Sequence, residues 1–100
     1  SLGWLARPQD APADATHSFF TYCVRVPAGR RDAFAKYLYQ NGIYTTLRYH
    51  PLHMNKIYGS SARLPVCERL NEEALSLPLH PGLKDGDVAK IVDMVKAWKG

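Results

Sequence analysis

The chain has 100 residues, a length that supports one small domain with a single hydrophobic core and excludes two domains. Its composition, 46% hydrophobic and 22% charged, is typical of a folded globular protein and excludes an intrinsically disordered chain. The formal net charge of +4 comes from basic residues that never occur more than two in a row, so nucleic-acid binding is not favoured.

Membrane insertion is also not favoured, because charge or proline interrupts every apolar run well before the roughly 20 residues that a spanning helix needs. No signal peptide is visible at the start. Cys23 and Cys67 lie far apart and form no Cys-x-x-Cys pair, which predicts two buried free thiols in a reducing compartment. We therefore expect a cytoplasmic protein.

The first residues, 1–16, are rich in Ala, Pro and Asp and show no usable periodicity. We expect a lead-in segment from an upstream domain, followed by a folded domain over residues 17–100. Within that domain, residues 17–26 alternate β-branched and aromatic side chains and predict a strand that Pro27 ends.

A helix is predicted over residues 30–41, where apolar residues recur at helical spacing before Gly42, which is placed to follow the helix end in a left-handed conformation. Residues 43–49 alternate again and predict a second strand. The connection over residues 50–63 is long and without clear periodicity, and loops of this length are more often functional than ornamental.

The last third predicts a helix opening at Pro65, a short strand over residues 74–77 and a final helix with Asp85 as its N-cap. The final helix carries a continuous apolar stripe of Val88, Ile91, Val92, Val95 and Trp98. The order is β-α-β-loop-α-β-α, which predicts an α/β domain with a small sheet covered by helices.

Candidate functional side chains gather where the second predicted strand ends. Arg48 can pair with phosphate or carboxylate, and Tyr49 and His53 can hydrogen-bond hydroxyl or carbonyl groups. A binding site for a polar ligand is one interpretation, and surface solvation or local loop capping are the others. A metal site at His50 and His53 is not favoured, because Pro51 prevents a regular helix and no further ligand pair stands nearby.

Other polar residues give weaker signals. His80, between Pro78 and Pro81, is expected to hydrogen-bond within its loop. Lys36, Lys56 and Lys84 occur in exposed contexts, so none of them suggests the desolvated amine that a Schiff base needs.

Three separated motifs, in order, resemble the carboxyl-terminal domain of the DegT/StrS-type sugar aminotransferases. They are Asn41-Gly-Ile-Tyr-Thr-Thr-Leu-Arg-Tyr-His-Pro-Leu-His53 with Ile57-Tyr58, Leu64-Pro-Val-Cys-Glu-Arg-Leu, and Ala74-Leu-Ser-Leu-Pro-Leu-His-Pro-Gly-Leu83. The resemblance covers about residues 17–98. It implies a small, mainly antiparallel sheet of three to four strands covered by helices, as in the small domain of fold-type-I aminotransferases.

The resemblance also implies an activity for the longer enzyme. Such enzymes use pyridoxal 5′-phosphate (PLP), commonly transfer the amino group of glutamate to a keto sugar carried on a nucleotide, and are usually homodimers. Their products feed antibiotic deoxysugars and surface polysaccharides. Their amino-terminal large domain holds the Schiff-base lysine, so we expect no catalytic, cofactor or metal residue here and no PLP binding by this piece alone.

What carries over residue by residue is the Tyr-x-Pro-Leu-His element, matched by Tyr49, Pro51, Leu52 and His53 at the edge of the substrate cleft. Many members have His where this chain has Arg48. The expected partners are the large domain and a nucleotide sugar. An apolar face involving parts of residues 1–16 and 50–63 is then expected to be exposed in the isolated piece.

Two other functions remain open. A free-standing α/β binding module would use Arg48, Tyr49 and His53 for an anionic ligand. A basic nucleic-acid-binding domain is the third, although the chain lacks the aromatic and basic strand signature of such proteins.

Overall fold

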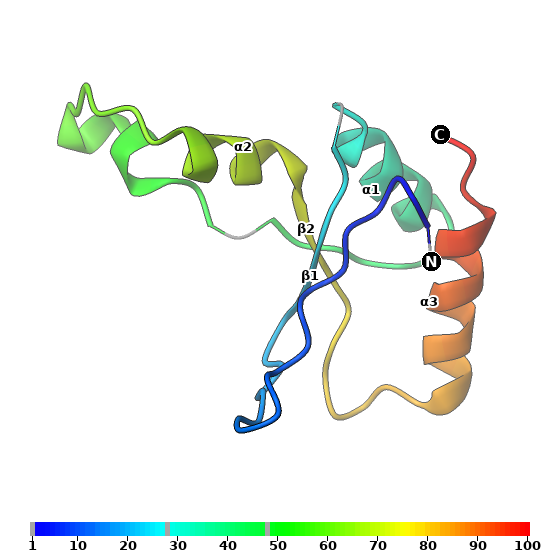
Figure 1. The fold of residues 1–100 in the computed structure, drawn as a ribbon. Coiled ribbons are helices and arrows are strands. Elements are labelled where there is room, and N and C mark those ends of the chain that lie inside the picture. Colours follow the sequence, from blue (N-terminus) through cyan, green and yellow to red (C-terminus); the bar gives the residue numbers. More distant parts are fainter. Residues whose placement is uncertain (1, 28, 48) are drawn as a thin grey trace.

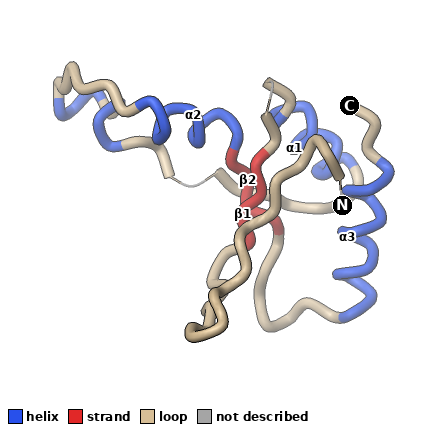
Figure 2. Tube along the Cα trace, in the orientation of Figure 1, coloured by secondary structure: helices blue, strands red, loops and turns tan. Residues whose placement is uncertain are grey.

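Two short antiparallel strands lie at the centre of the fold in the computed structural model, which describes residues 2–27, 29–47 and 49–100 (Figures 1 and 2). Strand β1 (Tyr22–Arg25) pairs with β2 (Ala74–Leu77), with Tyr22 opposite Leu77. Single bridges add Ala6 beside Arg25 on one edge and Thr46 beside Ser76 on the other. Four chain segments therefore lie side by side, and the predicted α/β class with a small antiparallel sheet is confirmed.

Both long predicted strands are shorter in the structure. The first begins at Tyr22 rather than at residue 17, because Phe19 has a φ of 46° and its N–H donates to His17 Nδ1 at 2.8 Å, which makes a local turn. The predicted strand over residues 43–49 contributes only the Thr46 bridge among its described residues. It is an edge segment whose one neighbour, β2, is itself four residues long.

The core lies where α1 (Arg31–Gln40) and α3 (Asp85–Ala97) pack near the sheet (Figure 1). Its buried apolar side chains are Val24, Val26, Phe34, Leu38, Ile43, Leu75, Val95 and Trp98. The predicted helix over residues 30–41 is confirmed with its ends one residue in. Gly42 follows with a φ of 78°, a left-handed conformation that glycine adopts without a Cβ penalty.

Three aromatic rings join distant parts of the chain within this core. The ring centroids of Trp4, Phe34 and Trp98 lie 5.1, 4.9 and 5.0 Å apart in their three pairs. Arg30 lies over the Trp98 ring at 4.9 Å, a cation–π contact. Residues 2–6 are thus anchored to the core, so the apolar part of the predicted lead-in segment is covered rather than exposed. Its origin in an upstream domain stays a prediction.

Helix α3 differs from the prediction at its start. Lys84 is the N-cap and Asp85 is the first helical residue, because the Asp87 carboxylate reaches back to accept the Lys84 N–H at 3.0 Å. The predicted apolar stripe is only half covered: Val95 and Trp98 are buried, but Val88 and Val92 are 46% and 42% exposed. This face of α3 has room for a further packing partner.

An arm formed by residues 50–73 projects from the core on the side away from α3 (Figure 1). It contains two single 3-10 turns (Leu52–Met54 and Lys56–Tyr58) and α2 (Pro65–Glu73), which was predicted to open at Pro65. Large apolar side chains are exposed along it, namely Leu52, Met54, Ile57, Tyr58, Leu64, Val66 and Leu70. The expected exposed apolar surface therefore exists in the 50–63 segment.

The arm makes the molecule open. Its radius of gyration is 15.3 Å, against about 13 Å for a compact domain of 100 residues. Its accessible surface is 7602 Å², whereas a compact monomer of this mass exposes about 5,700 Å².

Both cysteines are free, but Cys67 is exposed and Cys23 half-buried, so the predicted burial of the thiols is wrong. Cys67 lies on α2, at a position that is exposed in the described chain. Among the residues that the structure describes, no helix is both long and apolar enough to cross a membrane.

The inner end of the arm is held by Arg31. One guanidinium nitrogen of Arg31 donates to the backbone carbonyls of Asn71 and Ala74, each at 2.9 Å, and so binds the last turn of α2 to the start of α1. Because α2 ends at Glu73, these carbonyls are among those that a helix end leaves without intrahelical partners.

We expect Arg31→Gln to lower the free energy of unfolding by about 1.5–3 kcal/mol, the range for hydrogen bonds to a charged group. Urea melts would measure the loss, and hydrogen exchange of the α2 amides would place it at the base of the arm. Arg69→Gln, at an exposed position of α2, is the control and should change stability by less than about 0.5 kcal/mol. Equal effects of the two substitutions would contradict the anchoring role.

Candidate functional site

A wide groove of about 1060 Å³ lies between the core and the inner part of the arm. It is lined by residues 6–9, strand β1, residues 49–52, helix α2 with Leu64 before it, and Ala74 at the start of β2. Its wall is mostly apolar, with Leu52, Leu64, Val66 and Leu70 on the arm side. The groove is large enough for a ligand of drug or cofactor size.

Two arginines, Arg7 and Arg25, line the groove on the core side. Arg7 is exposed there, and Arg25 is half-exposed with its Nη1 3.8 Å from a Glu73 carboxylate oxygen. One of these two cations is thus partly neutralised within the chain. The two arginines make the core side of the groove locally positive, and water screens such exposed charges.

Tyr49 lines this groove as a residue that is 77% exposed, at the point where the chain enters the arm. Its neighbours in the wall include Pro51, which is buried. Arg48, the third member of the predicted binding set, lies outside the described residues.

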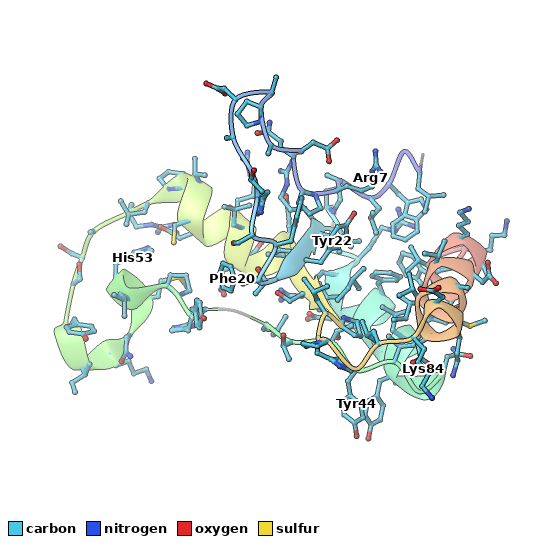
Figure 3. All side chains as sticks on the ribbon, turned by 90° about the horizontal axis from the view of Figure 1, so that it is seen from below. Arg7, Phe20, Tyr22, Tyr44, His53 and Lys84 are labelled. Carbon is cyan, nitrogen blue, oxygen red and sulfur yellow. The ribbon has the colours of Figure 1, made fainter. Side chains whose placement is uncertain are left out.

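His53 occupies a different place. Its side chain is only 9% exposed and lies in the arm, on the side of its turn that faces α2 (Figure 3). It lines a second hollow, of about 680 Å³, at the outer part of the arm. Tyr49 and His53 thus line separate hollows, one between the core and the arm and one in the outer arm, and their predicted role in binding a substrate stays a prediction.

The His53 ring is held by Glu68, the residue around which the outer arm is organised. His53 Nε2 lies 3.1 Å from Glu68 Oε2, which also accepts the Leu64 N–H at 2.7 Å. Arg63 donates to the other carboxylate oxygen at 2.6 Å. These donors lower the pKa of Glu68 from 4.5 to about 2, chiefly through the Leu64 N–H, then Arg63, then His53.

Glu68 was not singled out from the sequence. A signal was present: an acidic residue in the first turn of a helix that begins at proline can accept the N–H groups that a helix start leaves without partners. Here Glu68 accepts the N–H of the N-cap residue Leu64. The expectation for His80 is confirmed, since its Nδ1 accepts the Gly82 N–H at 3.2 Å within the loop.

The chain's own lysines do not fit the anchoring of PLP. All six are exposed, namely Lys36, Lys56, Lys84, Lys90, Lys96 and Lys99. A Schiff-base lysine needs an amine whose pKa is lowered by desolvation or by a neighbouring cation. None of these six lies in a desolvated setting, so we derive no chemical step through the cofactor in this chain. Within the described residues, no group of three or more His, Cys, Asp or Glu could hold a metal ion.

Comparison with known proteins identifies the family. The model of the DegT/DnrJ/EryC1/StrS aminotransferase family matches residues 3–96. The chain belongs to this family. The resemblance noted in the sequence is thereby confirmed over nearly the whole chain.

Two curated relatives show the level of similarity. The chain is 37% identical to a dTDP-4-dehydro-2,3,6-trideoxy-D-glucose 4-aminotransferase of Saccharopolyspora spinosa, over 86% of this chain and 22% of that relative. It is 33% identical to a UDP-N-acetyl-3-dehydro-alpha-D-glucosamine 3-aminotransferase of Acidithiobacillus ferrooxidans, over 87% of this chain and 24% of that relative.

Solved structures agree with the fold. The aminotransferase TlmJ of Streptoalloteichus hindustanus superposes with a TM-score of 0.92 at 45% identity, covering 97% of this chain and 26% of that one. DesV of S. venezuelae, solved in complex with a ketimine intermediate, superposes with a TM-score of 0.84 at 30% identity over 94% of this chain. The chain thus spans about a quarter of the length of the solved relatives that it matches.

The Glu68 hydrogen bonds predict a specific pH dependence of stability. The pKa of Glu68 is about 2 in the folded chain, whereas its ordinary value, which applies to the unfolded chain, is 4.5. Between these pH values the unfolded chain therefore binds more protons than the folded chain. The stabilisation is therefore fully present above pH 4.5 and is lost as pH falls through about 2. We expect the difference in unfolding free energy between the wild type and Glu68→Gln to shrink over this window.

Denaturant melts at several pH values would measure this difference. Glu72→Gln, at an exposed position of the same helix, corrects for the loss of one carboxylate charge. A gap between wild type and Glu68→Gln that stayed constant from pH 6 to pH 2 would show that the Glu68 contacts do not form in solution.

Proposed function

We propose that the chain is the carboxyl-terminal small domain of a PLP-dependent aminotransferase that transfers an amino group, from glutamate, to a keto sugar carried on a nucleotide. The observation that carries the proposal is the match to the sugar aminotransferase family over residues 3–96. Two relatives are named as aminotransferases of dehydro sugars on dTDP and UDP, which supports a nucleotide-linked keto sugar as the substrate class.

The open shape of the chain supports a role beside a larger domain. The arm exposes many apolar side chains, and the apolar stripe of α3 is only half covered. Exposed apolar surfaces of this kind are expected on a domain that normally packs against another domain. The solved relatives are about four times as long, which leaves room for a large domain that holds the cofactor. We further propose that the complete enzyme is a homodimer.

In this arrangement the large domain and this chain have different roles. PLP, bound by the large domain, supplies the electron sink for amino transfer. This chain contributes the groove wall with Tyr49 and the cations Arg7 and Arg25, which suit the diphosphate of a nucleotide sugar. A small domain placed over the cleft also excludes water from the reacting groups.

A second function has one observation in its favour. The groove of about 1060 Å³ and its two arginines belong entirely to this chain, as a free-standing module for an anionic ligand would require. The two functions differ in whether the chain binds a ligand tightly without a large domain.

Titration of the 100-residue chain separates them. We expect no saturable PLP absorbance change, because all six lysines are exposed, and only weak amide shifts around residues 44–58 with a dTDP- or UDP-linked sugar. Uridine without the diphosphate is the matched control ligand. Tight, specific binding of PLP or of the nucleotide sugar would instead establish the free-standing module.

Substitution of His53 in the complete enzyme tests the sugar site. We expect His53→Ala to impair the half-reaction with the keto sugar by roughly tenfold or more, the loss of about one hydrogen bond, while the glutamate half-reaction changes little. Single-turnover absorbance of the cofactor measures each half separately. His80→Ala, an exposed histidine that lines neither the groove nor the hollow of His53, is the control, and equal losses in both half-reactions would contradict the assignment.

A further inference from the structure

The contact between His53 and Glu68 restricts where the hydrogen of the imidazole can reside. Glu68 Oε2 lies 3.1 Å from His53 Nε2, within hydrogen-bond distance. A neutral imidazole carries one hydrogen, on either Nδ1 or Nε2, and the other nitrogen then accepts hydrogen bonds. The partner of one nitrogen therefore decides the chemistry that the other can offer.

Glu68 is a partner that accepts only. Its oxygens receive the Leu64 N–H, two Arg63 nitrogens at 2.6 and 3.3 Å and the His53 ring. These donors keep the carboxyl group ionised, and its pKa is about 2. An ionised carboxylate has no hydrogen to donate, so the hydrogen between the two groups must belong to His53 Nε2.

We propose that Glu68 is a positioning residue that fixes His53 in the Nε2–H tautomer and so presents Nδ1 as a hydrogen-bond acceptor for a hydroxyl group of the sugar substrate. This inference rests on the proposed function, because it assigns an atom to the sugar contact. Glu68 itself does not touch the substrate in this scheme, and Arg63 and the Leu64 N–H hold Glu68 in place.

The surroundings of His53 fit a ligand rich in hydroxyl groups. Most of the residues that line the hollow with His53 are polar, among them Asn55, Lys56, Ser60 and Ser61, and the others are Met54, Gly59 and Ala62. Hydroxyl, amide and ammonium groups provide both donors and acceptors for a sugar ring. If the contact only fastened residues 53–64 to α2, the hydrogen bond between His53 and Glu68 would be sufficient, and Nδ1 would have no role.

The tautomer can be read directly from the imidazole nitrogen shifts of the 100-residue chain labelled with ¹⁵N-histidine, at a pH where the His53 ring is neutral. His53→Gln assigns the signals against the other three histidines. We expect the wild type to show the Nε2–H form almost alone and Glu68→Ala to show the mixture of a free imidazole. Arg31→Gln, which loosens the base of the arm without touching His53, should keep the wild-type pattern.

Glu68→Gln keeps the experiment decisive if Glu68→Ala fails to fold. A Gln side chain both donates and accepts, so it should let the Nδ1–H form appear. A wild type with a substantial Nδ1–H population, or variants with an unchanged tautomer, would overturn the positioning role.

Kinetics of the complete enzyme test the acceptor atom itself. In His53→Gln the side-chain amide can still donate to Glu68 from a position close to that of Nε2, but no atom replaces Nδ1. We expect its KM for the nucleotide sugar to rise roughly tenfold with thermal stability retained and the glutamate half-reaction unchanged. An unchanged KM together with the expected tautomer would overturn the sugar contact but not the contact between Glu68 and His53. Failure of the sugar contact is therefore distinguishable from failure of the positioning role.

Discussion

The contact among Trp4, Phe34 and Trp98 is the interaction on which the rest of the fold depends. It joins the first residues of the chain, the middle of α1 and the residue after α3, three parts that no regular strand pairing connects. A two-stranded sheet alone is marginally stable in water and needs a packed face. The three rings, together with Val24, Leu38 and Leu75 of the same core cluster, supply that face. The arm can then project because the core does not require it.

This arrangement separates stability from function in space. The fully buried side chains belong to β1, α1, β2 and the segments beside them, whereas the candidate binding groups belong to the arm and its groove. The arm is ordered by polar contacts instead: Arg31 at its base and Glu68 near its tip. Charged and polar contacts of this kind specify orientation more than they add stability when they are partly exposed. The arm is therefore suited to be shaped further by whatever domain covers it.

Much of the fold could be predicted from the sequence, and the exceptions have physical causes. Helical spacing located α1, and Pro65 located the start of α2. Alternation alone overestimated the strands, since it cannot show that a His17–Phe19 turn interrupts the first or that the second has only a four-residue neighbour. The Tyr-x-Pro-Leu-His element located the arm, but not its partner Glu68. That contact depends on how α2 folds back onto the 3-10 turns, which no local pattern encodes.

One feature of the arm governs how it can move. Helix α2 ends at Glu73 and β2 begins at Ala74, with no intervening loop. A loop would provide soft backbone dihedrals for a hinge, whereas Ala74 passes directly into the strand and its carbonyl is held by Arg31. The junction therefore has no loop that could act as a hinge. If α2 changes position, we expect β2 to move with it as one body rather than the arm folding against the sheet.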